Sequence, residues 1–174
     1  MTSPDFPVPE PWLRGPVPGV PPLFQPVAHA LQHASEDVRA ALTGFPDAVL
    51  WARPADVASV GFHLRHMAGV LDRMATYARG EPLSPDQFAF LAAESAPGEE
   101  TTPDLVAALD AAIVRFMDVL RTTPEASARD ERAVGRRALP STVLGLLVHA
   151  AEHTQRHAGQ LLVTARIVTA GDVA

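Results

Sequence analysis

The chain has 174 residues, of which 47% are hydrophobic and 20% charged, as is ordinary for one globular domain with a buried core. Its net charge of -6 argues against a nucleic-acid binder, because such proteins usually carry a basic patch. The absence of cysteine excludes disulfides, thiolate-ligated zinc and a cysteine nucleophile, so that a metal site must use histidine, carboxylate or water ligands.

The first residues, MTSPDFPVPEPW, show neither the basic nor the apolar region of a signal peptide. No apolar run in the chain approaches the ~20 residues that a membrane-spanning helix needs. We therefore expect a cytoplasmic protein that makes no contact with a membrane.

Residues 1–26 are predicted to form an extended arm, because they hold nine of the 17 prolines and proline prevents regular helix. Two interpretations stay open: a strap anchored on the surface, or a partly ordered tail. The remaining residues, 27–174, are predicted to form the domain. The candidate anchors of the arm are Trp12, Leu13, Phe24 and the valines.

The rest of the chain is typical of helices, because its apolar residues recur at a period near 3.6. The charged segment 124–139 is predicted to be a loop. Four long helices without strand alternation predict an all-α four-helix bundle, and the link between the second and third is long enough for a crossover. The predicted helices are 27–45, 56–78 with Asp56 as its N-cap, a short helix 84–93, 102–121 and 140–168.

Histidine is the residue type most suggestive of function, and the chain has seven. His29 and His33 are four residues apart, which is the spacing of a metal-binding pair on a helix. At about 100° per residue, both point away from the apolar stripe of their helix. This pair is therefore predicted to be solvated.

The stretch HAAEHTQRHAGQ, residues 149–160, places three histidines on one helix, each four residues from the next. Relative to the apolar stripe, His157 lies about 60° away, His153 about 100° and His149 about 140°. Residues four apart on a helix have Cβ atoms roughly 6 Å apart, which suits two imidazoles that bind one ion. We predict that His153 and His157 are the metal-binding pair and that His149 leans to solvent.

The same stretch begins with H-x-x-E-H, the motif of inverted zinc proteases, in which two histidines bind zinc and the glutamate activates water. The chain is small for a peptidase of that kind, and we set this interpretation aside. An open metal site typically has three protein ligands, so a third is expected from another helix. In GFHLRHMAGVLDR, His63 lies about 60° and His66 about 120° from the apolar stripe, and periodicity alone favours His63.

The stretches SVGFHLRHMAGVLDR and LLVHAAEHTQRHAGQLL resemble the DinB/YfiT-like superfamily, and the resemblance covers residues 27–168. Its most specific element is the H-x-x-x-H-x-G-Q of residues 153–160. The resemblance implies a four-helix bundle with a long crossover, often dimeric, and a divalent metal between the helices. The family's second-helix ligand is followed by a small apolar pair, so the resemblance implies the ligands His66, His153 and His157.

Three further residues are candidates for roles around the metal. Gln160 lies one turn beyond His157 and is a candidate acceptor for the second N–H of a ligand. Arg73 and Tyr77 continue the His66 edge of their helix. They either line the pocket or are a solvated arginine and an aromatic at the margin of the core.

Three neutral imidazoles leave an ion its full positive charge and an open position, which favours activation of water, of a thiol or of a carbonyl. Nitrogen ligation suits zinc or nickel first, with iron or copper as alternatives, better than magnesium or calcium. The resemblance implies a thiol-dependent S-transferase or isomerase, whose low-molecular-weight thiol must come from outside.

Two other functions stay open. One is metal-dependent hydrolysis of a small molecule, which needs no thiol. The other is a non-catalytic, metal-binding and stress-associated bundle that acts through a protein interface. We expect a small-molecule substrate and a homodimer, without nucleic acid.

Overall fold

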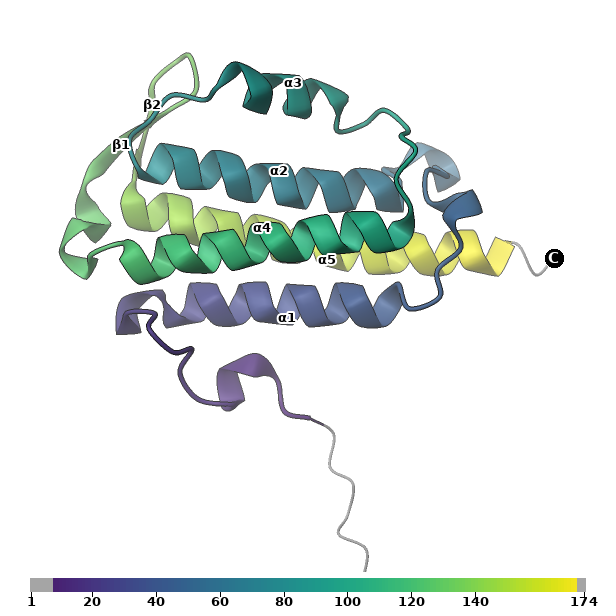
Figure 1. Cartoon of the computed structure of the whole chain (residues 1–174), viewed down its shortest axis with the longest axis horizontal. Helices are drawn as coiled ribbons and strands as arrows, with labels where there is room; N and C mark the ends of the chain where they lie inside the picture. The colour runs from purple at the N-terminus through teal and green to yellow at the C-terminus, as the bar shows by residue number, and fades with distance from the viewer. Residues whose placement is uncertain (1–7, 172–174) are drawn as a thin grey trace, which may run out of the picture.

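Four long helices form the body of the protein, which we describe from a computed structural model for residues 8–171 (Figure 1). Helices α1 and α2 occupy opposite corners, and each packs against both α4 and α5. Helices α1 and α5 run in one direction, and α2 and α4 run in the other (Figure 1). The predicted four-helix bundle is confirmed. The bounds are α1 Gln25–Ala41, α2 Val60–Ala78, α4 Thr102–Thr122 and α5 Val143–Gly171.

The connection between α2 and α4 is a long crossover, as predicted. It carries the chain back along the bundle, so that α4 begins at the end where α2 began (Figure 1). Within it lies a short helix, α3 (Pro85–Ala93), whose first turn is closed by a capping box of Ser84 and Gln87. This arrangement places α3 over α2, the helix that carries His63 and His66.

Two predicted helix boundaries are wrong by several residues. The second helix begins at Val60 rather than near Asp56, because the Ser59 hydroxyl accepts the N–H of Phe62 at 3.1 Å and acts as the cap. Asp56 instead ends a 3-10 turn and has a positive φ of 59°. The first helix ends at Ala41, before Gly44, whose φ is 70°.

The prediction that residues 124–139 form a loop is also wrong. The segment contains a 3-10 turn and the first strand of a hairpin, β1 (Glu131–Val134), which pairs antiparallel with β2 (Leu139–Thr142). The turn between them uses positive φ at Gly135 and Ala138. Because most of the hairpin is exposed, it carries no apolar alternation that a sequence pattern could reveal.

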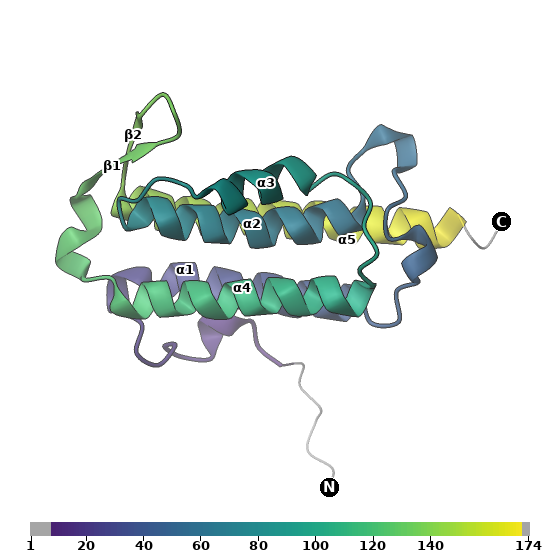
Figure 2. The same cartoon turned by 45° about the horizontal axis from the view of Figure 1, so that its top comes forward.

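The arm packs as a strap on the outer side of α1 and α4 (Figure 2). Its anchors are Val17, Val20 and Phe24, which are buried in the core, whereas Trp12 and Leu13 are 59% and 57% exposed. Residues 1–7 of the predicted arm and residues 172–174 lie outside the described residues. The strap interpretation holds for residues 8–24, and the division at residue 26 stays a prediction.

The core lies between the four helices and consists of the apolar stripes that the sequence predicts. Its largest fully buried side chains come from the end of the arm and from every long helix. None of the helices between residues 8 and 171 is both long enough and apolar enough to cross a membrane. The central side chains are Phe24, Leu31, Leu64, Met67, Leu71, Leu109, Phe116, Leu120, Leu147 and Leu161.

Candidate metal centre

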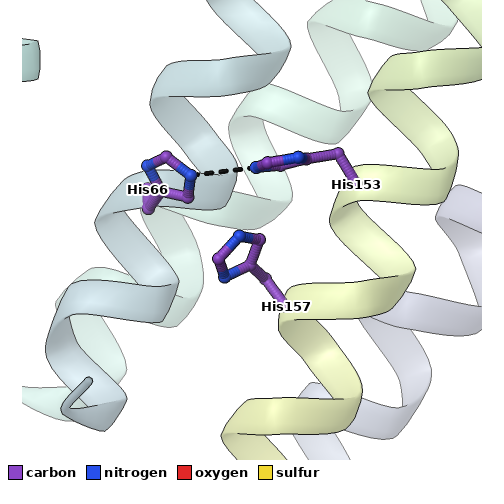
Figure 3. Close-up of side chains that lie close together, drawn as sticks. All are labelled: His66, His153 and His157. Atoms are coloured by element: carbon purple, nitrogen blue, oxygen red, sulfur yellow. Dashed lines mark hydrogen bonds between the residues drawn. The ribbon is translucent and has the colours of Figure 1, made fainter. Parts of the chain in front are cut away.

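Three histidines meet between α2 and α5. His66 comes from α2, His153 and His157 come from α5, and one ring nitrogen of each lies within 4.8 Å of the others. Figure 3 shows the three rings turned toward one another across the helix interface. The Nε2 atoms of His66 and His153 are 2.9 Å apart. The structure therefore brings together the three residues that the resemblance implied.

The donor set fits a single transition-metal ion. Zinc binds imidazole nitrogen at about 2.0–2.1 Å, and tetrahedral geometry then places two such nitrogens about 3.3 Å apart. The three nitrogens lie within 4.8 Å of one another, which is close to that spacing. An all-imidazole set suits zinc, nickel, copper or iron.

Two of the three histidines are held in the neutral form that a metal requires. Burial, with a smaller contribution from the neighbouring His66, lowers the pKa of His153 to about 4. Burial also lowers the pKa of His157 to about 3, with added contributions from His66 and His153. At neutral pH both rings therefore keep a free lone pair, and protons do not compete with an ion for it.

The ring of His66 is held from two sides. It stacks on Phe62, with the ring centroids 5.0 Å apart and 13° between the planes. Its Nδ1–H donates to Oε2 of Glu94 over 2.7 Å, and Arg73 donates to the other oxygen of that carboxylate at 2.5 Å. A carboxylate only accepts, so the lone pair of the neutral ring is on Nε2, the nitrogen that faces His153.

His63, which periodicity favoured as the third ligand, lies behind His157 instead. It is buried, and its Nδ1 is 3.0 Å from Nδ1 of His157, so the two rings share one hydrogen bond. That contact leaves the second nitrogen of His157 to face His66 and His153 (Figure 3). Burial, with a smaller contribution from His66, lowers the pKa of His63 to about 4.

Other predicted residues lie outside the three-histidine group. His149 is exposed and contacts Glu152 at 2.8 Å, in agreement with its predicted orientation. Gln160 is exposed and makes no side-chain hydrogen bond within residues 8–171, although Nδ1 of His153 is buried there without a partner. The supporting role of Gln160 stays a prediction.

The remaining candidate residues, Arg73, Tyr77, His29 and His33, do not contribute ring nitrogens or oxygens to the three-histidine group. Arg73 is buried in its ion pair with Glu94, and is neither solvated nor exposed in a pocket. Tyr77 packs against the margin of the core. His29 and His33 are both partly exposed and lie outside the three-histidine group, and Nε2 of His29 is 3.0 Å from the carbonyl oxygen of Gly15 in the arm.

Sequence reasoning missed Glu94, which is the strongest partner of His66. The only signal is a single carboxylate directly after the apolar run 88–93, and such a residue usually ends a helix in solvent. Its contact with His66 spans 28 positions and depends on the crossover folding back over α2. No local pattern reports such a contact.

A pocket of about 510 Å³ opens beside His63. It lies between the residues that precede α2 and the second half of α5. Its lining is mainly apolar, with Val57, Val163 and Ile167, while Arg156 and Gln160 supply polar groups. His63 links it to the metal-binding group through His157.

Comparison with known proteins agrees with this fold. Residues 30–161 match the DinB superfamily. A crystal structure of a protein from Streptococcus pneumoniae, at 12% sequence identity, matches with a TM-score of 0.61 over 82% of this chain and 88% of that one, which shows a shared fold. The curated proteins include no match. Because the matched segment covers most of the chain and includes all three histidines, the chain belongs to the DinB superfamily.

Proposed function

We propose that this protein is a metal-dependent enzyme that acts on a small molecule, with His66, His153 and His157 as the ligands of one divalent transition-metal ion. The observation that carries the proposal is the group of three ring nitrogens within 4.8 Å of one another. Zinc or nickel is the preferred ion, with iron or copper as alternatives. We place the enzyme in the cytoplasm.

A bound ion would supply positive charge and an open coordination position, which lower the pKa of a bound water or thiol and polarise a carbonyl. The protein's own residues hold and orient the ligands. Glu94 and Phe62 fix the ring of His66, and His63 fixes that of His157. Such support holds a site in one geometry before a substrate arrives.

The favoured reaction is transfer of an external low-molecular-weight thiol to an electrophile. The chain has no cysteine, so the nucleophilic sulfur must come from a second substrate. The pocket of about 510 Å³ beside His63 offers an apolar surface for the body of the substrate and Arg156 for an anionic group. Hydrolysis with water as the nucleophile is the second candidate, because the same histidines suit it.

Assays of the metal-loaded protein separate the two reactions. Electrophiles should be consumed in the presence of bacillithiol, mycothiol or glutathione, and the loss of activity in His153→Ala should match its loss of metal. Turnover of esters or amides without a thiol would favour hydrolysis. No turnover of either kind by protein that holds stoichiometric metal would contradict the enzymatic proposal.

The non-catalytic alternative needs a site closed by a fourth protein ligand. Within residues 8–171, the group of His66, His153 and His157 has no fourth member, although His149 and Glu152 form a second, more exposed group with His153. The described part of the arm lies on the opposite side of the bundle, against α1 (Figure 2). The homodimer that the resemblance implies stays a prediction.

A further inference from the structure

The carboxylate of Glu94 is buried although it directly follows a helix, α3, that is not buried. Helix α3 itself contains no buried residue, and Glu94 is the residue that follows its last turn. Its exposure is only 3%. A carboxylate is rarely buried to this degree unless it is paired, so we expect Glu94 to have charged or hydrogen-bonding partners.

Each oxygen of Glu94 has a separate partner on α2. Oε2 accepts the Nδ1–H of His66 at 2.7 Å, and Oε1 accepts from Arg73 at 2.5 Å. Both partners are buried or half-buried, with side-chain exposures of 18% and 7%. Glu94 therefore joins the crossover to a histidine of the metal-binding group.

Gly69 is the residue that lets this contact form. It lies one turn after His66, and a Cβ at this position would collide with Oε1 of Glu94 and would lie 2.8 Å from the ring of Phe90. The backbone of α2 thus provides a gap into which the end of α3 fits. Glycine in a helix interior is less favourable than alanine, and the contact of Glu94 with α2 offsets that cost.

We propose that Glu94 is a positioning residue for His66, and that through it the docking of α3 and the binding of a metal ion are coupled. The proposal rests on the metal site proposed above. An acceptor on Nδ1 keeps the lone pair of His66 on Nε2, directed at the group, and makes that nitrogen a better donor to a metal.

The coupling follows because few other contacts hold α3. Gln87 donates to Asp72 and Thr76, and Arg65 donates to the carbonyl oxygens of residues 93 and 96. A metal on Nε2 makes the Nδ1–H of His66 a stronger donor to Glu94. Linkage is reciprocal, so a metal that gains affinity from docked α3 must also stabilise the docked state.

The first experiment measures zinc affinity by competition with a chelator. Glu94→Gln should weaken zinc binding about 10–100-fold, the usual cost of losing an outer partner of a ligand. Glu94→Asp, which keeps the charge, should recover part of the affinity. The matched control is Glu99→Gln, an exposed residue without a side-chain hydrogen bond or ion pair in the described chain, which should bind zinc like the wild type.

Thermal unfolding of the metal-free variants separates positioning from general instability. A purely structural Glu94 would lower the melting temperature without changing zinc affinity or the visible spectrum of the cobalt-substituted protein. A positioning role requires the affinity loss and an altered cobalt spectrum in folded Glu94→Gln. Unchanged affinity and spectrum in that variant would overturn the inference while leaving the metal site intact.

Hydrogen exchange on the wild type tests the coupling directly, with Glu94→Gln as the comparison. Zinc should slow amide exchange in residues 85–94, and the slowing should vanish in Glu94→Gln if that variant folds. If zinc changed the amide exchange rates of α2 and α5 but left those of α3 unchanged, the coupling would be overturned. A wild type that takes up no stoichiometric zinc, nickel, iron or copper would overturn both the proposed site and this inference.

Discussion

His63 and His66 lie three residues apart on one helix and take different places at the site. Periodicity ranks residues by burial, and it ranked these two correctly, because His63 is 3% exposed and His66 only half-buried. Burial, however, is not what a metal ligand needs. The three-histidine group lies on the flank where α2 and α5 meet, so its members are half-buried, and family resemblance selected His66 where periodicity could not.

The first prediction concerns the three histidines of α5, His149, His153 and His157. Replacing His153 or His157 with alanine should abolish stoichiometric metal, because two ligands bind an ion weakly. His149→Ala is the matched control and should keep its metal, since His149 is exposed and outside the group. Elemental analysis of the purified variants measures this. Equal loss in all three would refute the assignment of the pair.

The second prediction separates a ligand from the residue behind it. His66→Ala should lower metal affinity more than His63→Ala, because His66 belongs to the group and His63 only contacts His157. We expect His63→Ala to cost about 10–100-fold, as for other outer partners, and His66→Ala to cost more. Chelator competition provides the values, and the reverse order would restore His63 as the ligand.

The third prediction is the pH dependence of the metal-free protein. The folded pKa values of His63, His153 and His157 are about 4, 4 and 3, below the value near 6.5 of an unfolded histidine. Well above pH 6.5 these histidines are unprotonated in both states, and their contribution to stability is complete. Below it the unfolded chain binds protons that the folded chain does not, so the free energy of unfolding should fall as pH drops toward 4.

Urea unfolding between pH 7 and pH 5 checks this before most carboxylates titrate. Replacing His63 with asparagine should flatten the slope, because one of the three groups is removed. A free energy of unfolding that stays constant over this interval would show that the histidines are not held neutral by burial.

At the scale of the element, the sequence predicted each long helix and misplaced some ends. The apolar residues of a helix recur over several turns, so the periodic pattern that predicts the helix becomes stronger with its length. The end of a helix, by contrast, depends on a single capping contact. Ser59 and Asp56 are both good caps by type, and only the observed hydrogen bond to Phe62 decides between them. The strands of the hairpin at 131–142 have four residues each and none of them is buried, so the hairpin carries too short and too weak an apolar pattern to be predicted.

The fourth prediction compares two glycines, one in the first turn of α2 and one within α5. At Gly159 of α5 a Cβ would meet nothing within 4 Å, so Gly159→Ala should raise the free energy of unfolding by about 0.5–1 kcal/mol. At Gly61 of α2 a Cβ would lie 2.9 Å from ring atoms of Trp51, so Gly61→Ala should lower it by about 1–3 kcal/mol. Urea titration measures both changes. Equal effects of the two substitutions would contradict the packing of Trp51 on α2.

At the scale of the whole molecule, the bundle and its crossover could be predicted, while the contacts of the crossover could not. The apolar stripes and the length of the link between α2 and α4 were sufficient for the architecture. The contact of Glu94 with His66 depends on how α3 folds back onto α2, and that packing appears only in three dimensions. Of the candidate anchors of the arm, Val17, Val20 and Phe24 are buried and Trp12 is exposed, a distinction that the sequence alone does not make.

In the proposed site, α2 and α5 together hold one metal ion and leave a coordination position open for chemistry. An anomalous-difference map from crystals of the metal-loaded protein tests it most directly. We expect one peak about 2.0–2.1 Å from a ring nitrogen of each of His66, His153 and His157, with no fourth protein ligand. A peak at His149 and Glu152, a fourth protein ligand, or no peak in fully loaded crystals would contradict it.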